Sequence, residues 1–209
     1  MKKISLNFAL LFLTLTAMLS GCSKTDVTPD QPTANAATQD AVVTAFLVKS
    51  YLFVRTPGPF GLGHTAVGYE VREMSGSTVS KTYTYCGGVE NSGGIPFVPA
   101  GGNNGGWLKY HDLSNNVPML NLMRTKGYTA YKCEVGFRNI SQANLTGAGN
   151  MLRYFPYRGY SVGDNNCSDA TYQVLSWLSA PNLMLPFFNW RPIDQYNKTM
   201  VGWSGSNRL

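Results

Sequence analysis

The order of strand-forming and helix-forming segments constrains the fold of this sequence more than any other feature. Segments rich in β-branched and aromatic residues are expected as strands: residues 42–55, 63–72, 78–86 and 128–137. Segments with apolar residues at helical spacing follow them: residues 141–155 and 167–178. Strands followed by helices, instead of alternating with them, predict an α+β domain with an antiparallel sheet and packed helices.

The composition of the 209 residues excludes a disordered chain and argues against a nucleic-acid partner. Apolar residues make up 44% and charged residues 13%, the reverse of what a disordered chain needs. The 17 Lys and Arg residues are spread along the chain without the dense cluster that nucleic-acid binding requires. The length suffices for one domain with a sizeable core.

The first residues are typical of an export signal. Lys2 and Lys3 precede an apolar run from Phe8 to Leu19, and small residues follow, as in a secretory signal. The run is shorter than the roughly 20 residues that span a bilayer. Leu19-Ser-Gly-Cys22 resembles the bacterial lipobox, which implies cleavage before Cys22 and acylation of that cysteine, for example by palmitate.

This resemblance sets the expected domain organisation and location. Residues 1–21 are interpreted as a lipoprotein signal peptide, and residues 22–40, poor in apolar side chains, as a flexible tether. Residues 41–209 form the expected folded domain. The bilayer is then a partner, and the protein is expected in a bacterial cell envelope, either periplasmic or surface-exposed.

The remaining cysteines admit two interpretations. Cys86, Cys133 and Cys167 lie in a compartment that is oxidising, and their odd number leaves at least one thiol unpaired. One interpretation is a Cys86–Cys133 disulfide with Cys167 kept as a reactive thiol. The other is that Cys86 and Cys133 are free, buried core residues. The sequence has no CxxC and only two His residues, so neither a metal site nor another cofactor is expected.

Cys167 and His64 are the candidate catalytic residues. Asn165 or Asn166 can cap the helix that Cys167 opens, and the free N–H groups of its first turn favour a thiolate and a lowered thiol pKa. A thiolate is a nucleophile for acyl transfer, and a neighbouring imidazole can protonate the leaving group. His64 follows Gly63 at the start of an expected strand. The alternative is that both residues are ordinary core residues.

Two short motifs add a resemblance to a known group. Phe60-Gly-Leu-Gly-His64-Thr-Ala-Val-Gly, followed by Asp164-Asn-Asn-Cys167-Ser-Asp-Ala, resembles circularly permuted papain-like thiol enzymes. That group includes NlpC/P60-like, PPPDE-like and lecithin–retinol acyltransferase-like proteins, and the likeness is greatest to a domain at the C-terminus of Rhs-type toxins. The resemblance implies a papain-like fold, with Cys167 as nucleophile and His64 as base. Asn166 and Asp169 match the accompanying pattern.

The group that would orient His64 is left open. If the hairpin turns at Gly76, His64 lies opposite about Gly88, and Glu90 and Asn91 are the nearest polar side chains. A plain Cys–His dyad is the alternative. Both residues belong to a stretch, 87–106, whose Gly-Gly pairs predict a long loop.

The expected function is that of a lipid-anchored cysteine hydrolase of the amidase or peptidase kind. The envelope location makes cell-wall peptides the natural substrate, so peptidoglycan or a peptide is the expected partner. A thiol acyltransferase, with residues 183–190 holding an acyl chain, is one alternative. A non-catalytic surface-binding lipoprotein is the other. The sequence identifies no inhibitory protein.

Overall fold

The computed structural model of the chain describes residues 42–56, 63–90, 97–112, 115–163, 165–183, 192–198 and 200–209. The expected signal peptide (1–21), the expected tether (22–40) and Cys22, the expected site of acylation, therefore lie outside the described residues. Within the described part, no helix is long and apolar enough to cross a membrane.

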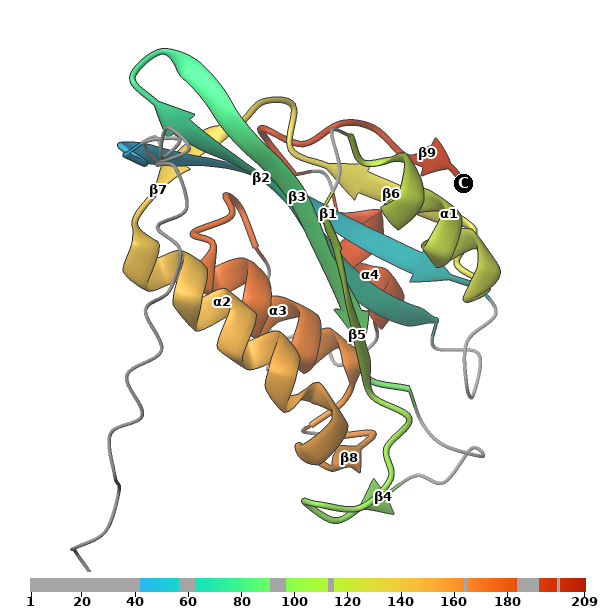
Figure 1. Cartoon of the computed structure of the whole chain (residues 1–209). Coiled ribbons are helices and arrows are strands. Elements are labelled where there is room, and N and C mark those ends of the chain that lie inside the picture. Colours follow the sequence, from blue (N-terminus) through green and yellow to red (C-terminus); the bar gives the residue numbers. More distant parts are fainter. Residues whose placement is uncertain are drawn as a thin grey trace, which may run out of the picture. The chain divides into compact units, whose positions relative to one another are not determined.

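An antiparallel sheet forms the centre of the domain (Figure 1). Its strand order is β5-β3-β2-β1-β6-β9, and β7 also pairs with β1. The strands are β1 (Ala45–Arg55), β2 (His64–Ser75), β3 (Thr78–Gly88), β5 (Trp107–Asp112), β6 (Ala130–Cys133), β7 (Arg138–Ile140) and β9 (Asn207–Arg208). A separate two-stranded sheet joins β4 (Phe97–Val98) to β8 (Tyr160–Ser161).

Helices cover both faces of the main sheet. The helices are α1 (Val117–Thr125), α2 (Gln142–Tyr154), the 3-10 helix η3 (Phe155–Tyr157), α3 (Cys167–Trp177) and α4 (Pro192–Asn197). Residues of α2, α3 and α4 pack into one buried cluster, and residues of α1 pack into a second. The expected α+β class with an antiparallel sheet and packed helices is confirmed.

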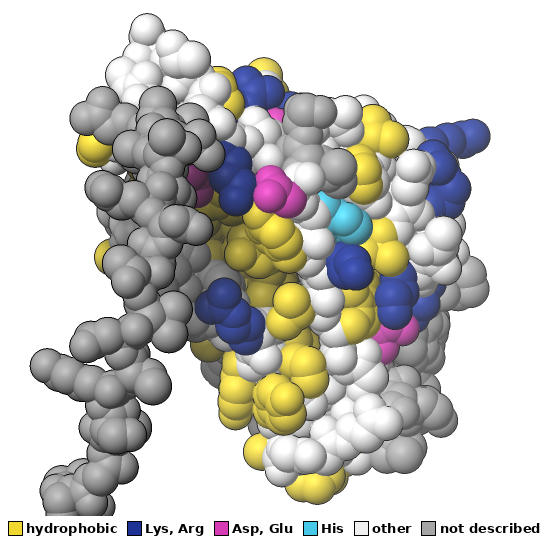
Figure 2. Space-filling model, viewed as in Figure 1, with side chains coloured by type: hydrophobic (Ala, Val, Ile, Leu, Met, Phe, Trp, Pro, Cys, Tyr) yellow, Lys and Arg dark blue, Asp and Glu magenta, His cyan; other side chains and the backbone are white. Residues whose placement is uncertain are grey.

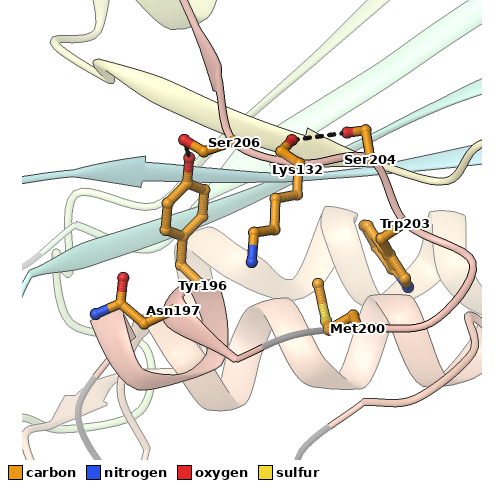
Figure 3. A pocket seen from close by; sticks show the side chains of 8 residues that line it. Lys132, Tyr196, Asn197, Met200, Trp203, Ser204 and Ser206 are labelled. Carbon is orange, nitrogen blue, oxygen red and sulfur yellow. Dashed lines mark hydrogen bonds between the residues drawn. The ribbon is translucent and has the colours of Figure 1, made fainter.

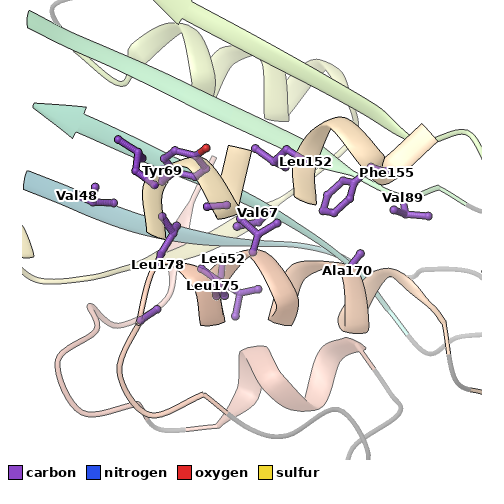
Figure 4. Close-up of a cluster of buried hydrophobic side chains, with 14 of the residues drawn as sticks. Val48, Leu52, Val67, Tyr69, Val89, Leu152, Phe155, Ala170, Leu175 and Leu178 are labelled. Carbon is purple, nitrogen blue, oxygen red and sulfur yellow. The ribbon is translucent and has the colours of Figure 1, made fainter. Parts of the chain in front are cut away.

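The alternation of β2 separates these two clusters. Val67 and Tyr69 belong to the cluster under α2 and α3, whereas Ala66 belongs to the cluster under α1 (Figure 4). Successive side chains of a strand point to opposite faces, so β2 supplies both cores. Gly68 lies on the α1 side, where a Cβ would be 2.5 Å from the sulfur of Met119.

The caps that the sequence predicts for the helices α2 and α3 are present. Ser141 accepts a hydrogen bond from the N–H of Asn144 at 3.1 Å and so caps α2. Asn166 caps α3, and the side chain of Asp169 accepts from the N–H of Asn166 to complete a capping box. The first turn of α3, where Cys167 lies, is therefore fixed by local hydrogen bonds.

One expectation about a loop needs correction, and two elements were not predicted. The stretch 87–106 is not one long loop, because β3 continues to Gly88 and β4 occupies Phe97–Val98. The helix α1 and the strand β5 were not expected at all. Most residues of β5 are exposed because it is an edge strand, so it lacks a regular alternation of buried and exposed side chains. The helix α1 begins beside Pro118, and its segment is too short to show clear helical periodicity.

The expectation of a disulfide between Cys86 and Cys133 is wrong, and all three described cysteines are free and buried. Cys86 pairs with Gly68, Gly68 with Tyr51, and Tyr51 with Cys133. The two cysteines thus share one row of the sheet but stand three strands apart, about 14 Å at the usual strand spacing. A disulfide needs Cα atoms within about 7 Å. The alternative of two free core cysteines is the correct one.

A row of tyrosines crosses the sheet beside α2. Tyr69 pairs with Tyr85, and Tyr85 pairs with Tyr110 on the edge strand β5. The rings of Tyr85 and Tyr110 lie 4.9 Å apart between centroids. Tyr110 is partly exposed, and Figure 2 shows hydrophobic side chains gathered at the centre of this face, next to Lys and Arg side chains.

Candidate functional site

Cys167 is the first residue of α3, and the cap leaves one N–H group of this turn beside the thiol. The side chain of Asn166 accepts hydrogen bonds from the N–H groups of Ser168, at 2.7 Å, and Asp169, at 3.3 Å. The backbone N–H of Cys167 itself faces its own sulfur. The partial positive charge of this N–H group, at the N-terminus of α3, therefore faces the Cys167 sulfur.

Burial outweighs this favourable setting for a thiolate. Desolvation raises the pKa of Cys167 to about 11, although hydrogen bonds from the backbone N–H and hydroxyl of Thr65 act to lower it. The sequence-based expectation of a lowered thiol pKa is therefore wrong. A helix N-terminus stabilises an anion by at most a few kcal/mol, and excluding water from a fully buried sulfur costs more.

His64 begins β2 beside a glycine that the local packing requires. Gly63 has a φ of +81°, and a Cβ there would lie 3.0 Å from the Cβ of Ile193 in α4. The His64 side chain is fully buried, and its ring centroid lies 5.9 Å from that of Tyr128. Burial, together with the charge of Arg55, lowers the pKa of His64 to about 3, so the imidazole is neutral at physiological pH.

The two candidate catalytic residues are not joined by a hydrogen bond. Within the described part of the chain, neither ring nitrogen of His64 has a hydrogen-bond partner. Thr65, the next residue of β2, lies against Cys167 and accepts a hydrogen bond from the Thr171 hydroxyl at 3.4 Å. Because neighbouring strand side chains point to opposite faces, Thr65 points towards α3 while His64 contacts Tyr128.

Tyr128 lies close to both His64 and Cys167. Its pKa is raised well above the ordinary value, first by burial and then by the proximity of Glu90 and Cys167. The Tyr128 hydroxyl is buried and has no hydrogen-bond partner. A Cβ on Gly88 would lie 3.0 Å from this hydroxyl. Three unpartnered polar atoms, two on His64 and one on Tyr128, thus occupy one buried region at the end of β2.

Glu90 lies close to this region but does not orient His64. It accepts a hydrogen bond from the indole N–H of Trp107 at 3.0 Å and lies 3.8 Å from the guanidinium of Arg55. A register irregularity beside Glu73 displaces β3 relative to β2. Extending the observed pairing of Val67 with Gly87 brings His64 opposite Glu90, not Gly88. Asn91, the other candidate, and Asp164 of the motif lie outside the described residues.

Sequence reasoning missed Thr65, Tyr128 and Arg55. Arg55 pairs with His64 across the sheet, and its guanidinium carbon lies 5.7 Å from the centre of the Tyr128 ring. Their sequence positions could have indicated Arg55 and Thr65, because Arg55 ends one expected strand and Thr65 lies near the start of the next. Nothing in the sequence placed Tyr128 there, since it belongs to a distant segment.

The described residues hold no cluster of His, Cys, Asp and Glu side chains that could bind a metal ion. Comparison of the sequence with protein-family models, and of the chain with curated proteins and solved structures, gave no match. The assignment of a function therefore rests on the residues of this chain.

The pKa of Cys167 predicts how its alkylation depends on pH. We expect iodoacetamide to modify Cys167 slowly at pH 7, with a rate that rises about tenfold per pH unit towards pH 11, because the thiolate is the reacting form. Peptide mass spectrometry would follow Cys167 separately from Cys86 and Cys133. A rate that levels off near neutral pH would contradict the burial of this thiol.

The pKa of His64 predicts a loss of stability in acid. The folded-state pKa of about 3 lies below the ordinary 6.5, so the unfolded chain takes up the proton first. Stability that is present above pH 6.5 is then lost as the pH falls towards 3, by up to about 1.4 kcal/mol per pH unit.

Urea unfolding at pH 7, 5 and 4 would measure this loss. Carboxylates contribute to it in every variant, so the comparison with His64→Phe isolates the histidine. We expect a shallower pH dependence for His64→Phe and a smaller change for His111→Gln, since burial lowers the pKa of His111 too but this side chain is only partly buried. Parallel curves for His64→Phe and the wild type would show that His64 is not buried in its neutral form.

Proposed function

We propose that this protein is a lipid-anchored cysteine hydrolase of the bacterial envelope that cleaves an amide bond, with a papain-like domain, Cys167 as nucleophile and His64 as base. The observation that carries the proposal is the position of the Cys167 sulfur. It lies at the start of a capped helix and accepts hydrogen bonds from Thr65, the residue next to His64.

The resting pair is neutral, and transfer of the proton from Cys167 to His64 requires substrate binding to bring the two pKa values closer together. The high pKa of Cys167 keeps it as a thiol, and the low pKa of His64 keeps its imidazole neutral. A neutral imidazole can accept a proton, and both nitrogens of His64 are without a partner. General base catalysis requires a hydrogen bond of about 3 Å between base and nucleophile. His64 lies against Tyr128 while Thr65 faces Cys167, so the backbone at the start of β2 must rearrange when substrate binds to bring the imidazole to the thiol.

The proposed reaction then follows the order of thiol acyl transfer. Cys167 attacks the carbonyl carbon while its proton passes to His64. This attack forms a carbon–sulfur bond and leaves an oxyanion on the former carbonyl oxygen. The Cys167 N–H, which the cap does not use, is placed to stabilise that oxyanion. The carbon–nitrogen bond breaks as His64 returns the proton to the leaving amine. Water hydrolyses the thioester and regenerates the thiol.

Envelope location favours peptide amides of the cell wall as substrate. The lipobox at Cys22 is the observation behind this location, and it is independent of the site geometry. The buried surroundings of Cys167 imply that a substrate must first gain access to the sulfur.

Digestion of peptidoglycan tests the proposal. The full chain is incubated with purified peptidoglycan and the soluble products are analysed by mass spectrometry. We expect new muropeptides with a free amine and carboxylate at one peptide bond. Absence of such products, together with failure of Cys167 to react with acyl-donor probes such as thioesters and activated amides, would remove the support for a hydrolase.

The same experiment separates the two alternative functions. Transfer of the acyl group from Cys167 to an added amine, in preference to water, identifies a thiol acyltransferase. The residues 184–190 that would hold an acyl chain lie outside the described residues. The missing hydrogen bond between His64 and Cys167 is the observation that favours a binding lipoprotein, and binding to peptidoglycan without cleavage would identify it.

A further inference from the structure

A cavity between β6, α4 and the C-terminal segment lies apart from the residues of the proposed thiol site. It has a volume of about 350 Å³, which lies within the range of small-molecule pockets. Lys132 of β6, Tyr196 of α4 and Trp203 of the C-terminal segment are among its lining residues (Figure 3).

Lys132 is the charged group that lines this cavity, and it has no anionic partner among the described residues. Its side chain is largely buried, and its ammonium donates a hydrogen bond to the backbone carbonyl of Lys198 at 2.8 Å. The ammonium lies 5.2 Å from the centre of the Tyr196 ring. No salt bridge among the described residues includes Lys132. A buried cation without a counter-ion is costly, and an anion in the cavity would relieve that cost.

The other polar groups of the wall are already used. The Tyr196 hydroxyl is hydrogen-bonded to the hydroxyl of Ser206. The Ser204 hydroxyl accepts from the N–H of Cys133 at 3.1 Å and donates to the carbonyl of Gly205 at 3.0 Å. The indole N–H of Trp203 donates to the carbonyl of Pro181 at 2.9 Å. The wall therefore offers a ligand one cation, together with polar groups that largely have partners already.

Three apolar or aromatic side chains also line the cavity that holds Lys132. The side chains of Met200 and Trp203 are almost fully buried and line the cavity together with the Tyr196 ring. The amide of Asn197 is exposed and also lines it. A ligand that matches these groups has one negative charge at one end and an apolar body at the other.

We propose that this cavity binds a small monocarboxylate with an apolar body, whose carboxylate pairs with Lys132 and whose body lies against Met200, Trp203 and the ring of Tyr196. A hydrogen bond from the Lys132 ammonium to a charged carboxylate is stronger than the one it makes to the uncharged carbonyl of Lys198. The formal net charge stays positive without Lys2 and Lys3 of the expected signal peptide, and a positive protein attracts anions.

Titration of the full chain with phenylacetate tests the site. Binding is measured by calorimetry and by tryptophan fluorescence, with acetate and the uncharged phenylacetamide as comparison ligands. We expect phenylacetate to bind at least about tenfold more tightly than either, because acetate lacks the apolar body and phenylacetamide lacks the charge. Equal binding of phenylacetate and phenylacetamide, or no binding of phenylacetate into the millimolar range, would overturn the proposal.

Two lysine variants locate the binding. Lys132→Met removes the charge but keeps much of the apolar stem, and we expect it to weaken phenylacetate binding about tenfold or more. Lys198→Met removes an exposed charge nearby and keeps the backbone carbonyl, so we expect less than about a twofold effect. Unchanged binding by Lys132→Met would place the ligand elsewhere. The comparison of the three ligands on the wild type decides the charge requirement even if Lys132→Met does not fold.

Discussion

Replacing Cys167 by serine is expected to lower the proposed amide cleavage by at least about a thousandfold, because a serine hydroxyl in this setting has no comparable nucleophilicity. The substitution exchanges one atom in a buried position where Thr65 already donates hydrogen bonds, so the fold should persist. The rate of muropeptide release, measured under identical conditions for both proteins, gives the effect.

A second cysteine supplies the matched control. Cys133 is also buried and free, but it lies on β6 in the cluster under α1. We expect Cys133→Ala to keep its activity within about threefold while losing about 1 kcal/mol of stability. Equal loss of activity in the two variants would show that the effect comes from the fold and not from the thiol. Full activity of Cys167→Ser would exclude Cys167 as nucleophile.

Replacing Gly159 by alanine is expected to lower the free energy of unfolding by about 3 kcal/mol. Gly159 has a φ of +76°, and a Cβ there would lie 2.6 Å from the carbonyl oxygen of Val98 and 2.9 Å from the backbone nitrogen of Ala100. The left-handed backbone costs a side chain about 1–2 kcal/mol. The clash adds about 1–3 kcal/mol, because backbone atoms move less readily than a flexible side chain.

Gly101 provides the control for this prediction. It also has a positive φ, +82°, but a Cβ there would meet nothing within 4 Å. Gly101→Ala should therefore show the backbone cost alone, about 1 kcal/mol. Urea unfolding of both variants measures the difference. Equal destabilisation would show that the contact between Gly159 and the segment around Val98 is not tight.

This contact also bears on the candidate site. The carbonyl of Gly159 accepts a hydrogen bond from Asn104 at 2.9 Å, and Arg158 next to it donates from Nε to the side chain of Asn165 at 2.9 Å. Asn165 precedes the cap of α3 by one residue. We therefore expect Gly159→Ala to reduce the proposed activity more than its loss of stability explains, since the start of α3 carries Cys167.

Local sequence patterns predicted the elements that carry the candidate residues. The apolar spacing after Ser141 and after Asn166 gave helices whose caps are present, because capping is a contact between residues a few positions apart. The first three strands were predicted for the same kind of reason, since alternation and turn residues are local. The helix α1 was missed because Met119 and Met123 become a buried pair only against the sheet.

Local sequence patterns were sufficient to predict an α+β chain with an antiparallel sheet, in which Cys167 begins a capped helix and His64 begins a strand. The neighbours, side-chain directions and pKa values of these residues depend on the tertiary structure. Register placed Cys86 and Cys133 three strands apart, strand alternation turned His64 towards Tyr128, and burial set the pKa values of His64 and Cys167 in directions opposed to an ion pair. Each of these results depends on contacts between residues far apart in the sequence, and desolvation by such contacts outweighs the local effect of a helix terminus.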